Sequence, residues 1–367
     1  MVPFLGHLTY SSCMADEILF DPHGPALLVG GYGTVGAEVA RMAAAALPLV
    51  LTGRSVSKGR QLAQETGAEL RAWDLAHPKG FESTARVVVS LVNDPHDRVL
   101  RAALRGGVPY VDITRWTARM QRAATVVAMQ GASAPVLLSS AWMGGVVSLV
   151  VAHLADELGG ADSVDVAIRW DLDDRAGADS VEFMDRLGFD FEIVEQGEYR
   201  MVEPLSSVSA VSIGDLMTKV ARIDTPEQFT LPLVFGVGAA RTRIGFGSPA
   251  TTSALIAAKK AGVFRWGRGD RFTAMRRAFL YSPGDGGTAR VRVDVTRGGR
   301  TRTGLIVDRA GQAHLTGVGA MLGVKRVLGM DGGTVAPGMT FPEMTPVPEK
   351  VPAMLAEHGV ELLIDHG

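Results

Sequence analysis

The segment of this sequence whose residue types best suit ligand binding is a glycine-rich stretch that directly follows the apolar run Ala26–Val29. Gly31, Gly33 and Gly36 have the spacing G-x-G-x-x-G, and an alanine-rich stretch of helical character comes next. Between a strand and a helix, such glycines allow a tight turn and a close approach of the backbone to a pyrophosphate. A βα turn without a ligand is the alternative. The predicted contacts of this dinucleotide-binding turn are Gly31, Gly33, Thr34, Val35 and Gly36.

A basic turn ends the second predicted strand, residues 48–52. Proteins that bind NAD commonly carry an acidic residue near this point for the ribose 2′-hydroxyl. Here there is none. Arg54 can stack on an adenine and pair with a 2′-phosphate, Ser55 can donate a hydrogen bond, and Lys58 adds positive charge. The pattern favours NADP(H) over NAD(H), with a solvated basic turn as the alternative.

The ends of two further predicted strands supply the remaining cofactor contacts. In a doubly wound sheet, ligands collect beyond the carboxyl ends of the parallel strands. Leu91, Val92 and Asn93 follow the fourth predicted strand and are expected to line the nicotinamide and its ribose. Asp74 ends the third strand, where it either meets the adenine or caps a turn.

Three polar residues near strand ends are candidates for catalysis. A histidine suits acid–base work near neutral pH, so His96 is one candidate, although it can equally begin the next helix and face solvent. Thr114 follows the fifth strand and is expected to face the cofactor, whereas Asp112 is expected to form a structural pair. Asp171 lies among charged residues that could orient a polar substrate, although a solvated loop is favoured there.

Composition limits the class of protein. The chain has 367 residues, of which 47% are hydrophobic and 21% charged, and its formal charge of −2 gives no reason to expect nucleic acid or an anionic membrane as a partner. One cysteine, Cys13, excludes an intramolecular disulfide and a cysteine-rich metal site, and no metal is expected. Without a signal peptide or an apolar run of about 20 residues, the chain is expected to be cytoplasmic.

The order of strand and helix patterns predicts an α/β protein with two domains. Six βα-like units, with strands expected at residues 26–29, 48–52, 69–74, 87–92, 108–114 and 135–139, predict a Rossmann doubly wound parallel sheet. Alternating segments such as Val164–Trp170 and Val291–Val295 then predict an inserted α+β domain on a mixed or antiparallel sheet. We expect an N-terminal arm at 1–24, the Rossmann domain at 25–160, the second domain at 161–309, and a C-terminal segment at 310–367 that packs back on the Rossmann domain.

Several of these segments together resemble the saccharopine dehydrogenase-like NADP-binding oxidoreductases. The resemblance is carried by the glycine loop, the Gly53-Arg54-Ser55 turn, Ser90-Leu91-Val92 followed by His96, Tyr110–Ile113, and the closing segment around Val335–Gly338. It covers most of the chain in order and is specific in the first domain only. It implies a Rossmann domain with an inserted α+β domain, a homodimer, and NADPH-dependent reduction of imines or related double bonds in a small molecule.

The chain departs from that family after the sixth strand. Family members that act on amino acids often carry Gly-x-Asp-Pro-Gly there, whereas this chain has Ala141-Trp142-Met143-Gly144-Gly145. Met143 replaces the aspartate, so no carboxylate is available at that position for a proton or an ammonium group. Trp142 instead suggests an apolar cleft and is a further candidate for the catalytic site. This weakens the case for saccharopine or another zwitterionic amino acid as substrate.

Three functions remain open from the sequence. The first is an NADPH-dependent reductase of a C=N bond in a small metabolite, in a specialised biosynthetic pathway. The second is an enoyl (C=C) reductase that acts on a carrier-bound or lipid-like substrate. The third is a non-catalytic NADP-binding protein, which the loss of the family aspartate supports.

Overall fold

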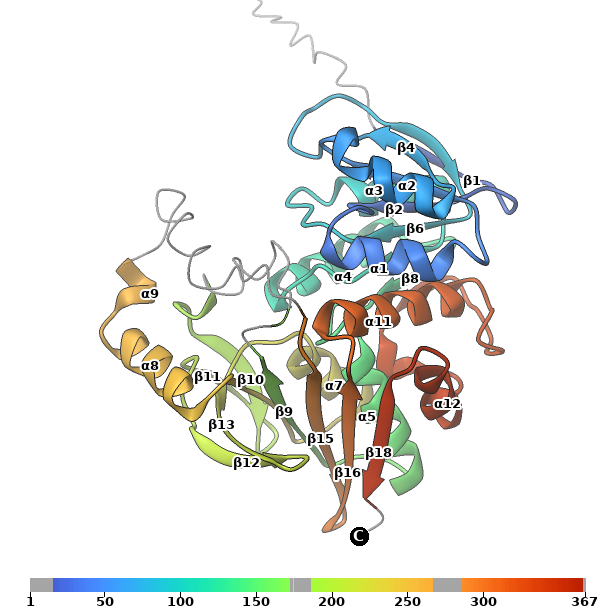
Figure 1. The fold of residues 1–367 in the computed structure, drawn as a ribbon. Coiled ribbons are helices and arrows are strands. Elements are labelled where there is room, and N and C mark those ends of the chain that lie inside the picture. The colour runs from blue at the N-terminus through green and yellow to red at the C-terminus, as the bar shows by residue number, and fades with distance from the viewer. Residues whose placement is uncertain (1–15, 172–173, 175–185, 267–285, 366–367) are drawn as a thin grey trace, which may run out of the picture.

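The computed structural model describes residues 16–171, 174, 186–266 and 286–365. These residues form two seven-stranded sheets and two smaller two-stranded ones. Figure 1 shows the two large sheets in separate parts of the molecule, with helices α1 (Thr34–Ala43) and α11 (Gln312–Val327) lying near their junction. Cys13 lies outside the described residues.

The first large sheet is parallel throughout and has the order β17-β8-β7-β6-β2-β3-β4. If the strands of this sheet are numbered 1 to 7 along the chain and the sheet is followed from β4 to β8, the order is 3-2-1-4-5-6, with β17 as a seventh strand beside β8. This is the strand order of a doubly wound dinucleotide-binding sheet, so the predicted sheet is confirmed. Each strand is shorter than or close to its predicted length. The strands are β2 (Ala26–Val29), β3 (Leu49–Gly53), β4 (Glu69–Ala72), β6 (Val87–Ser90), β7 (Tyr110–Asp112), β8 (Pro135–Leu138) and β17 (Gly338–Thr340).

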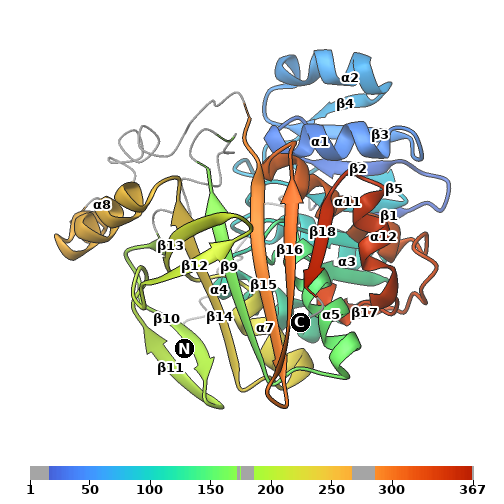
Figure 2. The ribbon, with the colours of Figure 1, turned by 60° about the horizontal axis from the view of Figure 1, so that its bottom comes forward.

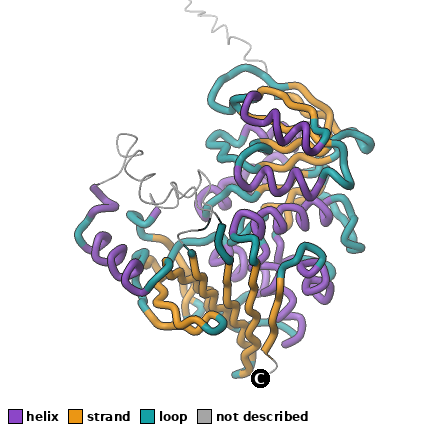
Figure 3. Tube along the Cα trace, viewed as in Figure 1, coloured by secondary structure: helices purple, strands orange, loops and turns teal. Residues whose placement is uncertain are grey.

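Helices cover both faces of this sheet, as Figure 3 shows. Successive residues of a strand point to opposite faces, so the fully apolar run of β2 buries Leu28 on one side and Leu27 on the other. The Leu28 face packs on α1 and α11, and the Leu27 face packs on α3 and α4. The helices are α1 (Thr34–Ala43), α2 (Arg60–Thr66) after a 3₁₀ turn η1 (Val56–Gly59), α3 (Arg98–Gly106), α4 (Thr117–Gln130) and α11 (Gln312–Val327).

A short strand precedes the Rossmann unit, within the segment expected to be an arm. β1 (Glu17–Phe20) pairs in parallel with β5 (Glu82–Ala85) and packs against α3. The contact is close: a Cβ atom on Gly106 of α3 would lie 1.7 Å from the carbonyl oxygen of Ile18. Asp16 adds an ion pair with Arg98, at 2.8 Å. This part of the N-terminal segment therefore belongs to the folded domain.

The second large sheet is mixed and has the order β12-β13-β14-β9-β15-β16-β18. β9 and β14 are parallel neighbours and the other pairs are antiparallel; Figure 2 shows β9, β15, β16 and β18 side by side. In β15 the residues Val291, Val293 and Val295 are fully buried and alternate with polar ones, as predicted. The strands are β9 (Ser163–Trp170), β12 (Ser209–Ile213), β13 (Leu216–Arg222), β14 (Ala239–Phe246), β15 (Ala289–Arg297), β16 (Arg300–Asp308) and β18 (Glu361–Asp365).

Helices and a hairpin complete the second part. α5 (Val146–Leu158) packs against β15 and β16, and α7 (Glu227–Phe235) packs against β14. The hairpin of β10 (Phe191–Glu195) and β11 (Glu198–Val202) stands apart as its own two-stranded sheet. The remaining elements in the described residues are α8 (Pro249–Lys260), α9 (Val263–Trp266), η3 (Pro342–Met344), η4 (Pro348–Lys350) and α12 (Val351–Ala356).

The C-terminal segment contributes to both parts of the fold. α11 packs on α1 and β17 extends the first sheet beside β8. β18, however, pairs with β16 at the edge of the second sheet. The sequence analysis expected this segment to pack on the Rossmann domain, where α11 and β17 lie, and it did not foresee the pairing of β18. Strand pairing between residues so distant in the chain leaves no local sequence signal.

Candidate functional site

The glycine loop joins β2 to α1 and leaves open space in front of its middle glycine. A Cβ atom on Gly36 would lie 2.4 Å from the carbonyl oxygen of Gly30, so this position packs loop against helix. On Gly33 the only neighbour of a Cβ atom within 4 Å would be that same carbonyl oxygen, at 3.3 Å. Gly33 caps α1, and among the described residues no side chain caps this helix and no acidic residue lies in its first turn. The backbone N–H groups of Thr34 and Val35 therefore remain available to an anion.

The basic turn after β3 is held against this loop by Tyr32. The hydroxyl of Tyr32 accepts a hydrogen bond from the backbone N–H of Ser55, at 3.0 Å. Burial raises the pKa of Tyr32, although the Ser55 N–H and the Arg54 charge oppose the rise, so the phenol is neutral at ordinary pH. Arg54 and Lys58 are exposed, and within the described ranges neither forms an ion pair. Two cationic side chains are thus available beside the glycine loop.

The strand ends place the other predicted cofactor residues as follows. Val92 lies against the glycine loop, since a Cβ atom on Gly30 would come within 2.8 Å of the Cβ atom of Val92. Leu91 is buried and Asn93 half-buried in the same segment after β6. Asp74 accepts a hydrogen bond from the backbone N–H of Ala76, at 3.0 Å, which is the turn-capping arrangement left open by the sequence.

A buried ionic cluster joins residues of β7 to the segment that follows it. Arg115 and Asp112, both with fully buried side chains, pair at 2.7 Å, and the hydroxyl of Tyr110 donates to Asp112 at 2.6 Å. Burial alone would raise the pKa of Asp112, but Arg115 and the donors around it hold that pKa below its usual value. The predicted structural pairing of Asp112 is confirmed. Thr114 donates its hydroxyl to Asp112 at 2.8 Å, so this hydroxyl is a member of the cluster.

The other catalytic candidates lie in three separate places. His96 is exposed in the turn before α3, where its backbone N–H donates to Asp94. Asp171 follows β9, is half-buried, and accepts a backbone hydrogen bond from Asp174. Trp142 packs edge-on against Trp170, with ring centroids 6.2 Å apart. No contact described here joins His96, Thr114 and Asp171 in one constellation.

The segment carrying Trp142 is fixed by a buried carboxyl from α7. The backbone N–H of Trp142 donates to Glu227 at 3.1 Å, and the hydroxyl of Thr242 donates to the same carboxyl at 3.0 Å. Burial raises the pKa of Glu227. The backbone of Met143 has a φ of 55°, in the left-handed region that a non-glycine residue rarely adopts. This segment is therefore held in an uncommon conformation between the two parts of the fold.

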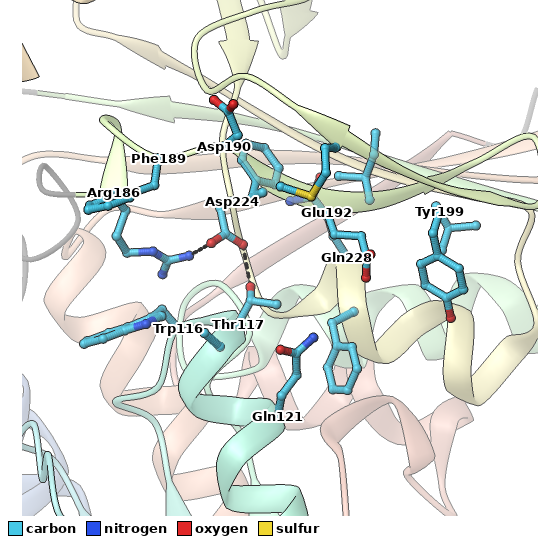
Figure 4. A pocket seen from close by; sticks show the side chains of 16 residues that line it. Trp116, Thr117, Gln121, Arg186, Phe189, Asp190, Glu192, Tyr199, Asp224 and Gln228 are labelled. Carbon is cyan, nitrogen blue, oxygen red and sulfur yellow. Dashed lines mark hydrogen bonds and ion pairs between the residues drawn. The ribbon is translucent and has the colours of Figure 1, made fainter. Parts of the chain in front are cut away.

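A cavity of about 620 Å³ opens between the first part and the β10–β11 hairpin. On one side lie Trp116 and Thr117, just beyond the end of β7, and Gln121 of α4. Figure 4 shows Glu192 and Tyr199 extending toward them from the hairpin, with the Arg186–Asp224 ion pair at one end. The hydroxyl of Thr117 also donates to Asp224. We call this cavity the hairpin pocket.

None of the catalytic candidates predicted from the sequence lines the hairpin pocket, which the sequence did not reveal. Trp116 is two residues from Thr114, but Arg186, Tyr199 and Asp224 come from segments to which no role was given. The signal present in the sequence was the alternation of Tyr199 and Met201 in β11, a strand whose side chains are mostly exposed. Large apolar side chains on an exposed hairpin indicate a surface that binds something.

Within residues 16–171, 174, 186–266 and 286–365, no group of three or more His, Cys, Asp or Glu side chains is placed to hold a metal ion. In the same residues, no helix has both the length and the apolar character needed to cross a lipid bilayer.

Comparison with known proteins gives matches in structure alone. No protein-family model matches the sequence, and no curated protein matches it. Apo saccharopine dehydrogenase (L-Glu forming) from Saccharomyces cerevisiae superposes with a TM-score of 0.64 at 14% identity, over 93% of this chain and 99% of that chain. Two other structures match less well. Scyllo-inositol dehydrogenase from Lactobacillus casei has a TM-score of 0.42 at 11% identity, over 93% of this chain and 99% of that chain. Myo-inositol dehydrogenase from Corynebacterium glutamicum has a TM-score of 0.40 at 11% identity, over 96% of this chain and 100% of that chain. The chain therefore has the two-domain fold of saccharopine dehydrogenase, as the resemblance implied.

Proposed function

We propose that this protein is an NADPH-dependent oxidoreductase that transfers a hydride to a C=N bond of a small molecule. The observation that carries the proposal is the pairing of the glycine loop with a basic turn through Tyr32 and Ser55. The loop offers backbone N–H groups to a pyrophosphate, and the turn offers Arg54 to a 2′-phosphate. A solved structure that superposes with a TM-score of 0.64 bears the name saccharopine dehydrogenase, which supports the same class of reaction.

The residues present fit a phosphorylated nicotinamide dinucleotide. Gly33 has room for a phosphate oxygen where any Cβ atom would intrude, and α1 has no acidic residue in its first turn to repel it. Arg54 is exposed and, in the part of the chain described, unpaired. When bound, the cofactor supplies the hydride. The protein then has to bind and orient the acceptor, exclude water from the site and stabilise the charge on the acceptor.

The acceptor is assigned to the hairpin pocket. Trp116 and Thr117 follow β7 at the carboxyl edge of the first sheet, the edge where ligands of doubly wound folds bind. A pocket of about 620 Å³ matches a small metabolite.

The proposal is tested in two steps with the full chain. Calorimetric titration should give tighter binding of NADP⁺ than of NAD⁺, and Arg54→Glu should reduce or reverse the preference. NADPH oxidation should then be followed with a panel of imines and carbonyl–amine pairs, and separately with enoyl thioesters. Turnover of imines supports the proposal. Turnover of enoyl thioesters alone would show that the protein reduces a C=C bond and not a C=N bond. Absence of binding to both dinucleotides would overturn it.

A further inference from the structure

We infer that the hairpin pocket binds a cationic nitrogen, as a protonated amine or an iminium ion, carried on an apolar body. The inference deepens the proposed function, on which it rests, by naming the class of acceptor. It is carried by the juxtaposition, on one face of the hairpin, of an unpaired carboxylate and large exposed apolar side chains.

The apolar part of the site is exposed to an unusual degree. Phe189, Tyr199 and Met201 are 51%, 64% and 65% exposed, and all three line the pocket. Soluble proteins rarely leave such side chains together in solvent unless the surface binds a ligand or partner. A cavity with Phe229 and Ile193 also in its wall suits a molecule with an apolar body, so this part of the site recognises hydrocarbon or aromatic surface.

The charged part of the site has an excess of negative charge. Asp190, Glu192 and Asp224 line the pocket together with a single cationic residue among the described ones, Arg186. Arg186 is already paired with Asp224. Glu192 is exposed and has no ion pair or hydrogen bond through its side chain in the described part of the chain. In Figure 4 its carboxylate extends from β10 toward α4, into the pocket. An anionic ligand would be repelled here, and a cation attracted.

The strand register places an aromatic ring beside this carboxylate. Glu192 pairs with Met201, and Val194 pairs with Tyr199, so Glu192 and Tyr199 are diagonal neighbours on one face of the hairpin. Diagonal residues of this kind are about 7–8 Å apart, and somewhat less between their Cβ atoms, so one small cationic group can contact both side chains. A cation within about 6 Å of an aromatic ring is attracted by its face. Across the pocket, Trp116 already has the guanidinium groups of Arg119 and Arg186 at 5.0 and 5.7 Å from its ring.

A cationic acceptor also agrees with the chemistry available. Hydride addition to the carbon of R₂C=N⁺HR′ gives R₂CH–NHR′, while NADPH becomes NADP⁺, so the positive charge passes from substrate to cofactor. The C=N π electrons become the nitrogen lone pair and no proton is transferred in this step. A protein that binds the iminium ion needs no acid beside the bond.

The inference is tested by calorimetric titration of three probes of similar shape: 2-phenylethylamine, 2-phenylethanol and 3-phenylpropionate. The wild-type chain should bind the amine at least about tenfold more tightly than the carboxylate at neutral pH and low salt. Glu192→Gln should weaken amine binding about fivefold and leave the alcohol unchanged. Glu198→Gln is the matched control, because Glu198 lies on the same hairpin, is exposed and does not line the pocket; it should change neither.

Three results would overturn the inference: no binding of any probe, carboxylate binding as tight as amine binding, or an unchanged amine affinity in Glu192→Gln. NADP⁺ is titrated separately. Amine selectivity without NADP⁺ binding would overturn the proposed function and leave the pocket's selectivity standing. NADP⁺ binding without amine selectivity would overturn the inference alone.

Discussion

The hydroxyl of Tyr32, in the glycine loop, accepts a hydrogen bond from the backbone N–H of Ser55, in the turn after β3, at 3.0 Å. Two glycines make this contact possible, because a Cβ atom on Gly53 would lie 2.4 Å from the Tyr32 hydroxyl and one on Gly59 would lie 2.7 Å from its ring. The loop and the turn are therefore held as one unit. If Arg54 binds a 2′-phosphate, Tyr32 fixes the position of the backbone that carries the Arg54 side chain.

Tyr32→Phe should lower the preference for NADP⁺ over NAD⁺. The variant keeps the ring that fills the space above Gly53 and loses only the acceptor for the Ser55 N–H. We expect NADP⁺ affinity to fall about three- to tenfold, with a smaller change for NAD⁺, as measured by calorimetry. The ratio of the two affinities is the diagnostic quantity, since general damage to the fold would weaken both alike. An unchanged ratio would show that Tyr32 does not position the turn.

Gly33→Ala and Gly36→Ala should separate cofactor binding from stability. At Gly33 the backbone has a φ of −73°, which alanine tolerates, and the added methyl group meets only the Gly30 carbonyl oxygen, at 3.3 Å. We expect a nearly normal midpoint of thermal unfolding and at least about a tenfold loss of NADP⁺ affinity, because the methyl group occupies the phosphate's approach. At Gly36 the clash at 2.4 Å should lower the unfolding midpoint by about 5 °C.

Gly238→Ala is the control for both substitutions. A Cβ atom there would have its nearest neighbour at 3.7 Å, and the backbone is not in the left-handed region. It should change neither the unfolding midpoint nor the affinity. Normal NADP⁺ binding by Gly33→Ala would mean that the loop does not hold a pyrophosphate.

The first sheet could be predicted because its information is local. Each strand is a short apolar run, such as Val87–Ser90, and glycines end the helices between them, so order and type could be inferred from neighbouring residues alone. The pairing of β18 with β16 and of β1 with β5 joins segments that are distant in the chain. No local pattern specifies such partners, so the sequence did not predict these pairings.

The candidate site divides in the same way. The glycine loop and Arg54 form a continuous stretch of chain around one βα unit, so spacing alone was enough to propose their role. The hairpin pocket takes Trp116 from one part of the fold and Glu192, Tyr199 and Asp224 from the other. Their meeting depends on how the two parts pack. Thr114 looked suitable for the cofactor, but its hydroxyl donates to Asp112, a contact that sequence spacing could not distinguish from a free hydroxyl.

Asp112→Asn should destabilise the protein strongly. Both Asp112 and Arg115 have fully buried side chains, and loss of the carboxylate leaves the guanidinium with Asp97 as its remaining partner. Breaking a buried pair in this way typically costs about 3 kcal/mol, which urea unfolding at neutral pH can measure. Because the pKa of Asp112 is depressed in the folded state, its contribution is present above the ordinary aspartate value and is lost as the pH falls below it. The difference in free energy of unfolding between variant and wild type should therefore become smaller in acid. A difference that stays constant would contradict this role of Asp112.

Glu343, in η3, is a buried carboxyl whose charge is poorly compensated. It is 3% exposed, and no described group lies in hydrogen-bonding geometry with either of its carboxylate oxygens. Burial raises the pKa of Glu343; the neighbouring hydroxyls of Thr230 and Ser148 oppose this rise, and the charge of Glu227 adds to it. The folded protein thus binds this proton more tightly than the unfolded chain does. The contribution of protonated Glu343 to the free energy of unfolding is complete below the pKa of this group in the unfolded chain. It is lost as the pH rises through the pKa of the group in the folded protein.

Glu343→Gln should therefore become more stable relative to wild type as the pH rises from about 5 to about 8. The amide imitates the protonated carboxyl and cannot ionise, so the variant escapes the cost of an uncompensated charge. Urea unfolding at several pH values would give the difference in free energy. Glu349→Gln, at an exposed position in η4, is the matched control and should follow the wild type at every pH. A difference between Glu343→Gln and wild type that shrinks or stays constant over this range would show that the folded state holds Glu343 ionised without penalty.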